Sequence, residues 1–237
     1  MNRKTTIIMS ILLGFASVPS FAQYSHNRAM LIQDKLRESC SKQPNLNLKY
    51  EAADMPISSH ISYRDLLSKG GQKHGVQLYG LYTNELSLQT NYKVNEFTIE
   101  NNSCFYISDI VFTVKVTPNI YIANEAAQFP CMKRKVFEHE MEHHKFFMLA
   151  LNAEHDNLQR EIKERFANIP VKYHAADIPQ ITEFVKSNVS TMQSNFVNQI
   201  NNRKAPYDKN LDNPNNTARE QQACQNELLH LHQLYRR

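Results

Sequence analysis

A short run near the middle of the chain contains the residues best suited to chemistry. Between Val136 and His144 lies a His-Glu-x-x-His motif formed by His139, Glu140 and His143. On a helix, a rotation of about 100° per residue places the two histidines one above the other on one face. Two imidazoles in that arrangement can bind one Zn²⁺ ion, and a carboxylate beside them can take a proton from a metal-bound water. The motif therefore predicts a zinc hydrolase with His139 and His143 as ligands and Glu140 as general base.

The apolar residues around the motif favour a buried site. They continue the face that carries the two histidines, and they are Met132, Val136, Phe146, Phe147 and Ala150. Burying imidazoles without partners is costly, and a metal ion would satisfy both of them at once. The alternative is that Glu138 to Lys145 forms a solvated, charged helix face, because short motifs also arise by chance.

A catalytic zinc site usually has three protein ligands, so a third must come from elsewhere. The familiar position six residues after the second histidine holds Leu149. If helices beginning near Met132 and Pro179 form an antiparallel pair, equal distances from their connection lie side by side, which places residues near position 204 or later opposite the motif. We therefore predict that Asp208 is the third ligand or orients a ligand histidine, and that the Tyr207 hydroxyl stabilises an oxyanion.

Other assignments of the third ligand stay open at this level. Asp212 and Glu220 are competitors for the position, because both lie in the same polar C-terminal region. The pair Tyr207-Asp208 could instead form only a turn after Pro206.

The N-terminus predicts export. A basic start with Arg3 and Lys4 precedes an apolar run from Ile7 to Val18, and Ser20 and Ala22 supply small residues before Gln23. This order is typical of a secretory signal peptide over residues 1–22, with an uncleaved anchor as the alternative. We expect a periplasmic or secreted protein with no stable membrane anchor after cleavage.

The composition of the remaining chain gives no reason to expect nucleic-acid binding. Of 27 Lys and Arg residues, removal of Arg3 and Lys4 leaves 25 against 23 acidic residues, and no basic run stands out. A length of 237 residues suits a single domain over residues 23–237, with helical arms at both ends.

Four cysteines in an exported chain predict two disulfide bonds. Three pairings are possible. We favour Cys104 with Cys131, which would tie the start of a strand to the start of the motif helix, and Cys40 with Cys224. Cysteine ligation of the metal is the alternative.

The hydrophobic pattern predicts an α+β fold. A small antiparallel sheet, with a turn at Asn101-Asn102, precedes a long motif helix in an antiparallel helix pair and a C-terminal helix. An edge strand of this sheet could bind an extended peptide, or the sheet could be purely structural. The expected strands are 46–50, 86–92, 96–99 and 105–122, and the expected helices are 27–41, 63–67, 132–166, 179–202 and 217–235.

Several features occur together between Ser59 and Gln225. Gly80-Leu81-Tyr82-Thr83 precedes a strand, Cys104 opens the sheet, and the motif helix is followed later by Tyr207-Asp208. In these features the chain resembles a family of bacterial secreted proteins that contain a domain of unknown function and are predicted to be zinc-dependent proteases. The resemblance implies a zincin-like metallopeptidase.

The chain departs from the pattern of that family at two places. Asn213-Pro214 stands where a His-Gly is expected, and Glu142 replaces a frequent glycine. If the family's third ligand is that histidine, this chain either lacks it or uses Asp208 or Asp212 instead. The expected substrate is a peptide or protein. The alternatives are a hydrolase of cell-wall amide bonds and a non-catalytic binding protein with a structural metal site.

Overall fold

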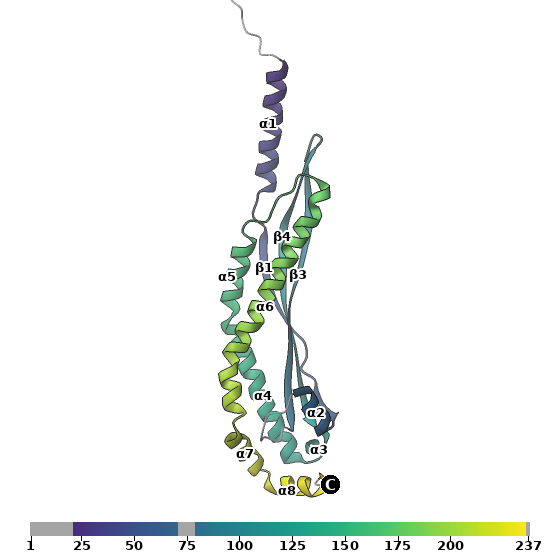
Figure 1. Ribbon diagram of the computed structural model, residues 1–237, viewed down its shortest axis with the longest axis vertical. Helices are drawn as coiled ribbons and strands as arrows, with labels where there is room; N and C mark the ends of the chain where they lie inside the picture. Colours follow the sequence, from purple (N-terminus) through teal and green to yellow (C-terminus); the bar gives the residue numbers. More distant parts are fainter. Residues whose placement is uncertain (1–20, 71–78, 236–237) are drawn as a thin grey trace, which may run out of the picture.

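Two long antiparallel strands run most of the length of the molecule (Figure 1). β3 (Gly80–Ile99) and β4 (Asn102–Ala123) pair from Gly80 opposite Ile122 to Ile99 opposite Asn102, around a turn in which Glu100 has φ 56°. A computed structural model describes residues 21–70 and 79–235 of the chain. Its architecture is α+β, as the sequence predicts.

Two short strands complete the sheet. β1 (Asn45–Ala52) and β2 (Ile57–Ile61) both pair with β4 in parallel, β1 along residues 109–116 and β2 along residues 120–123. The sheet is therefore mixed, and the prediction of a purely antiparallel sheet is wrong. Because β3 occupies one edge of β4 throughout, β1 and β2 follow each other along the opposite edge.

One face of the sheet is buried and the other is polar. On β4 the side chains of Ile110, Phe112, Val114 and Val116 are buried, whereas the alternating residues Thr113 and Lys115 are only partly buried. This two-residue alternation is typical of a sheet covered on one side. The covered side forms the main hydrophobic core with Phe147 and Leu151 of α4, Leu158, Ile162 and Phe166 of α5, and Val185, Met192 and Phe196 of α6.

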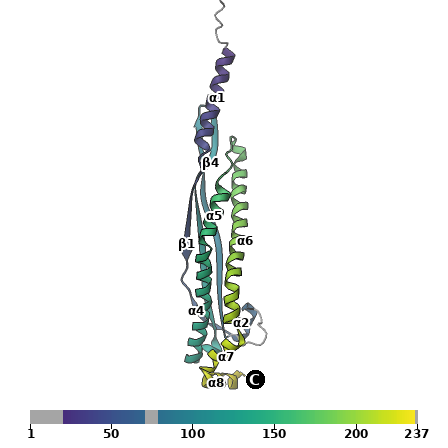
Figure 2. The same cartoon turned by 90° about the vertical axis from the view of Figure 1, so that its left-hand side faces the viewer.

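Three helices cover that face (Figure 2). They form the predicted antiparallel arrangement, in which two consecutive helices make up one side and a third makes up the other. α4 (Pro130–Ala153) and α5 (His155–Phe166) run in succession along one direction, and α6 (Ile178–Leu211) returns beside them. The single long helix expected over residues 132–166 is interrupted at Glu154. A short 3₁₀ turn, η1 (Ala175–Asp177), precedes α6.

α6 continues past Pro206, so the prediction that this helix ends near Asn202 is wrong. A proline inside a helix removes a backbone hydrogen bond and costs about 3 kcal/mol. Contacts made beyond the proline offset this cost: Tyr207 stacks on Phe146 of α4, and Asp208 is paired with His143. Most of the segment 201–216, which joins the expected helices 179–202 and 217–235, is therefore helical.

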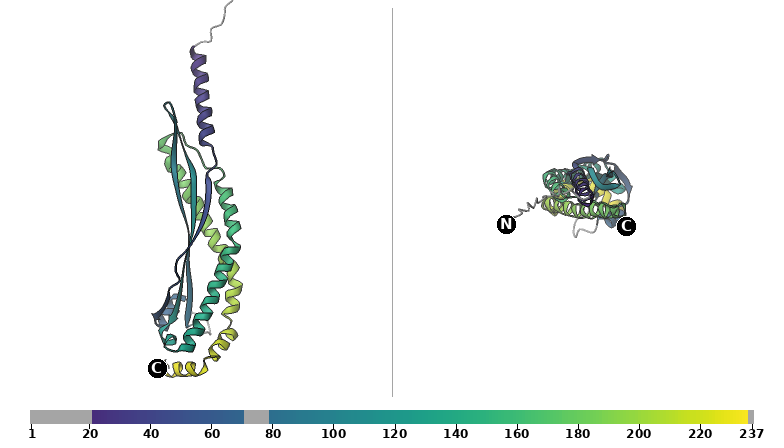
Figure 3. Two further views of the ribbon diagram at one scale, coloured as in Figure 1. Left: turned by 180° about the vertical axis from the view of Figure 1, so that it is seen from behind. Right: turned by 90° about the horizontal axis from the view of Figure 1, so that it is seen from above.

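The remaining helices lie at the two ends of the molecule (Figure 3). α1 projects beyond the hairpin turn at one end, and the C-terminal helix expected over residues 217–235 is divided in two at the other.

The predicted signal peptide lies almost entirely outside the described residues. Among the described helices, none is long and apolar enough to cross a membrane. The ranges are α1 (Phe21–Cys40), α2 (Tyr63–Gly70), α3 (Asn124–Ala127), α7 (Pro214–Gln222) and α8 (Gln225–Tyr235).

The two disulfide bonds are Cys40–Cys104 and Cys131–Cys224, so the predicted pairing is wrong. Cys104 lies in β4 near the hairpin turn, whereas Cys131 opens α4 after the opposite end of that strand. At about 3.3 Å per residue, β4 separates these positions by about 60 Å, which no disulfide can span. Each bond therefore closes one end of the molecule. Two disulfides are typical of a protein in an oxidising compartment.

Candidate metal centre

The seam between α4 and α6 brings four chemically active side chains together. His139 and His143 lie one turn apart on α4, and Asp208 and Asp212 lie one turn apart at the end of the antiparallel α6. Buried apolar residues flank this part of α4, because Met132, Phe147 and Ala150 pack into the core. The two helices thus present a pair of imidazoles to a pair of carboxylates.

Both histidines direct the same ring atom at one carboxylate oxygen. His139 Nε2 lies 3.3 Å from Asp212 Oδ1, and His143 Nε2 lies 3.0 Å from that same oxygen. Ligand atoms placed 2.0–2.1 Å from a tetrahedral zinc ion are roughly 3.3 Å from one another. The donor atoms of His139, His143 and Asp212 all lie within 4.8 Å of one another, so this set fits one small metal ion.

Asp208 contacts the other side of the His143 ring. Its Oδ1 lies 2.9 Å from His143 Nδ1, and its Oδ2 accepts a hydrogen bond from Lys204 Nζ at 2.5 Å. A carboxylate in this position fixes the ring orientation and the tautomer that leaves Nε2 for a metal. Asp208 thus contacts the ring nitrogen of His143 opposite Nε2, whereas Asp212 contacts the Nε2 atoms of both histidines. The metal-ligand roles of Asp208 and of its competitor Asp212 stay predictions.

The carboxylates also change the proton affinity of this cluster. Burial acts to lower the pKa of His143, but the hydrogen bonds and charges of Asp208, Asp212 and Glu140 outweigh it and raise that pKa to about 9. Burial acts to raise the pKa of Asp208, but the hydrogen bonds from His143 and Lys204 lower it below its usual value. The cluster is a tightly coupled set of charges between two helices.

The Glu140 side chain lies against the start of β3, close to the histidine pair. It is 3% exposed, and its carboxylate accepts a hydrogen bond from the backbone N–H of Tyr82 at the start of β3. Burial raises the pKa of Glu140, against the opposing effects of His139, His143 and the Tyr82 backbone. A buried carboxylate with a raised pKa, one residue from a candidate ligand, is suited to accept a proton.

The close approach of β3 to α4 requires a glycine. A Cβ atom at Gly80 would lie 2.5 Å from Glu140 Oε1 and 2.5 Å from Val136 Cγ1. Any larger residue at this position would have to push β3 or the Glu140 side chain aside. Gly80 therefore helps to hold Glu140 where it is.

Sequence reasoning assigned no role to the pair formed by Tyr82 and His144. The Tyr82 hydroxyl lies 3.1 Å from His144 Nδ1, and burial, together with the charge of Asp208, raises the pKa of Tyr82 to about 12 despite a hydrogen bond with Asn84. Tyr82 thus stays a neutral hydroxyl close to the cluster. The only signal in the sequence was its place in the Gly-Leu-Tyr-Thr segment.

Two further candidate residues were predicted, Tyr207 and Glu220. The Tyr207 ring stacks on Phe146 with centroids 4.8 Å apart, and the residue is 53% exposed. A role for its hydroxyl in catalysis stays a prediction. Glu220 lies in α7, and its side chain is outside the described part of the chain.

Comparison with known proteins identified no relative of this chain. No family model, no curated protein and no solved structure matches it.

Proposed function

We propose that this protein is an exported zinc-dependent metallohydrolase that cleaves peptides. One observation carries the proposal: the Nε2 atoms of His139 and His143 converge on Asp212 Oδ1, while Glu140 is buried beside them. Two imidazoles and a carboxylate form a donor set that suits Zn²⁺ and leaves a fourth position for water or substrate. The resemblance noted in the sequence predicts the same activity, but no family model matches the chain.

The chain's own residues have distinct roles in this mechanism. A zinc ion held by His139, His143 and Asp212 would supply Lewis acidity and lower the pKa of a bound water. Asp208 orients the His143 ring through Nδ1, and Glu140 receives the proton of the attacking water and passes it to the leaving amine. The backbone N–H of Tyr82 and the close contact at Gly80 hold the Glu140 carboxylate in place.

Export is supported by two features of the chain. The basic and apolar N-terminal segment resembles a signal peptide, and all four cysteines form disulfide bonds among the described residues. We therefore place the activity in the periplasm or outside the cell, where peptides and the peptide part of the cell wall are the available amide substrates.

The test combines metal content with turnover. Elemental analysis of the purified mature chain should find about one zinc per chain in the wild type and in Glu140→Gln, and none in His143→Ala. Hydrolysis of a peptide library and of peptidoglycan fragments should be lost in Glu140→Gln and kept in Glu138→Gln, an exposed neighbour on the same helix. A wild-type chain that binds no zinc when zinc is supplied would refute the proposal.

A structural metal site is the second candidate, and the burial of the cluster favours it. The side chains of His139, His143 and Asp212 are only 10–12% exposed, and they lie between two helices that a metal ion would join. In that case zinc raises the unfolding temperature, no substrate is cleaved, and Glu140→Gln changes neither result. Turnover by the wild type decides between the two functions.

A further inference from the structure

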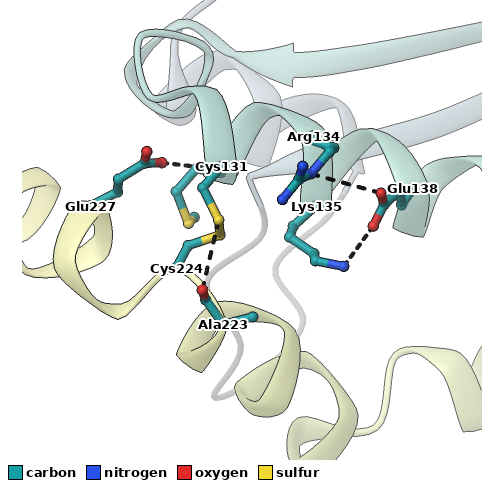
Figure 4. The surroundings of a disulfide bond; sticks show 8 residues. Cys131, Arg134, Lys135, Glu138, Ala223, Cys224 and Glu227 are labelled. Atoms are coloured by element: carbon teal, nitrogen blue, oxygen red, sulfur yellow. Dashed lines mark hydrogen bonds and ion pairs between the residues drawn. A yellow bond between two sulfur atoms is a disulfide. The ribbon is translucent and has the colours of Figure 1, made fainter.

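The disulfide Cys131–Cys224 joins the start of α4 to the segment between α7 and α8 (Figure 4). Cys131 lies in the first turn of α4, eight residues before His139. Cys224 lies twelve residues after Asp212, between α7 and α8. The bond thus closes a short covalent path from one side of the centre to the other.

Two noncovalent contacts strengthen this connection. Glu227 Oε2 accepts a hydrogen bond from the backbone N–H of Met132 at 2.9 Å, where a negative charge is favourable at the start of α4. Leu231 of α8 is 2% exposed and belongs to the same hydrophobic cluster as Met132 and Cys224. Glu227 and Leu231 thus hold α8 against the start of α4 together with the disulfide.

The contacts described between the end of α6 and α4 are mainly polar. The last buried residue of α6 is Ile200, so the stretch that carries Asp208 and Asp212 adds no buried apolar side chain to the core. Pro206 also removes one backbone hydrogen bond from this stretch. Among the described residues, this stretch contacts α4 through the polar pairs at the centre and through the stack of the exposed Tyr207 on Phe146.

We propose that the Cys131–Cys224 bond positions Asp212 and thereby makes metal binding depend on oxidation of these two cysteines. This inference rests on the proposed metal centre and adds its regulation. Bond formation removes two electrons and two protons from the two thiols, and a disulfide-bonded protein oxidant accepts them and becomes a dithiol. Before export the thiols stay reduced and the centre binds zinc weakly; after export the bond forms and the centre is preorganised.

The chain offers a matched control at its other end. Cys40–Cys104 ties α1 to β4 near the hairpin turn, far from the centre (Figure 1). The bonded cysteines are 64 residues apart in Cys40–Cys104 and 93 residues apart in Cys131–Cys224. Because loop-closure entropy varies with the logarithm of loop length, the two bonds constrain the unfolded chain almost equally.

The experiment compares zinc affinity in two double variants of the mature chain. Cys131→Ser/Cys224→Ser and Cys40→Ser/Cys104→Ser are titrated with zinc against a chromophoric chelator, and thermal unfolding is measured without metal. We expect a similar loss of thermal stability in both, but a zinc affinity that is about 10- to 100-fold weaker only in the first. A thiol reductant added to the second variant breaks only Cys131–Cys224 and should reproduce that loss.

Three outcomes are distinguishable. Equal zinc affinity in both folded variants and in the wild type would overturn the positioning role of the bond while leaving the proposed function intact. No zinc binding by the wild type would overturn the metal centre itself. If the serine variant does not fold, Cys131→Ala/Cys224→Ala keeps the buried position of Cys224 apolar, and its zinc affinity gives the same comparison.

Discussion

Substituting the two aspartates of α6 one at a time tests how the centre is built. Asp212→Asn replaces the carboxylate that lies 3.3 Å and 3.0 Å from the two Nε2 atoms. Asp208→Asn instead changes the partner of His143 Nδ1 and of Lys204 Nζ. Both variants keep an oxygen of similar size in the same place and remove one negative charge. They are therefore matched controls for each other.

The expected losses of zinc affinity differ in size. Loss of an orienting partner usually weakens metal binding 10- to 100-fold, or about 1.4 to 2.7 kcal/mol, which is our expectation for Asp208→Asn. Asp212→Asn replaces one of the three proposed ligands by a neutral amide, so zinc affinity should fall by more than roughly 100-fold. Zinc titration against a competing chelator, at one pH and ionic strength, measures both values.

The opposite order would refute this reasoning. If Asp208→Asn releases zinc and Asp212→Asn retains it with near wild-type affinity, Asp208 is the ligand and Asp212 is not. Equal, small effects in both variants would mean that neither carboxylate binds the metal.

Three further predictions concern stability. Gly80→Ala should lower the free energy of unfolding by about 1–3 kcal/mol, because its Cβ would lie 2.5 Å from a carboxylate oxygen of α4; an unchanged unfolding temperature would contradict that contact. Phe147→Ala, in the core, should cost about 3–5 kcal/mol, whereas Leu149→Ala, 56% exposed on the same helix, should cost at most about 0.5 kcal/mol. Burial acts to raise the pKa of Glu154, but hydrogen bonds from Asn157 and Arg203 and the charge of Arg203 lower it below 4.5. The contribution of the Glu154 carboxylate to the free energy of unfolding is therefore present above about pH 4.5 and lost as the pH falls through the lowered pKa. The difference in free energy of unfolding between wild type and Glu154→Gln should shrink in acid, and urea unfolding from pH 7 to pH 3 measures it.

Much of the fold follows from local patterns in the sequence. The two-residue alternation along residues 105–122 identifies β4, since it needs only one buried face. The spacing of His139 and His143 places both on one face of α4 because helical geometry is local. Even the neighbourhood of Asp208 and Asp212 could be estimated, because two helices joined by a short connection have a common rise per residue.

Other features depend on distances that a pattern does not contain. The predicted disulfide pairing was wrong because β4 is 22 residues long and separates Cys104 from Cys131 by its whole length. The predicted end of α6 before Pro206 was wrong because contacts with α4 offset the cost of the proline, and these contacts exist only in the packed pair. A penalty read from one residue does not include what its neighbours gain.

Some features of the candidate centre follow from the sequence, and others depend on tertiary packing. The sequence by itself determined the imidazole pair and the adjacent carboxylate, because three residues within five positions of one helix fix their own geometry. Only the tertiary structure decided which aspartate faces the Nε2 atoms, which one contacts His143 Nδ1, and that Gly80 and Tyr82 confine Glu140. These relations join residues about 60 to 70 positions apart, and their directions depend on how helix, helix and strand pack together.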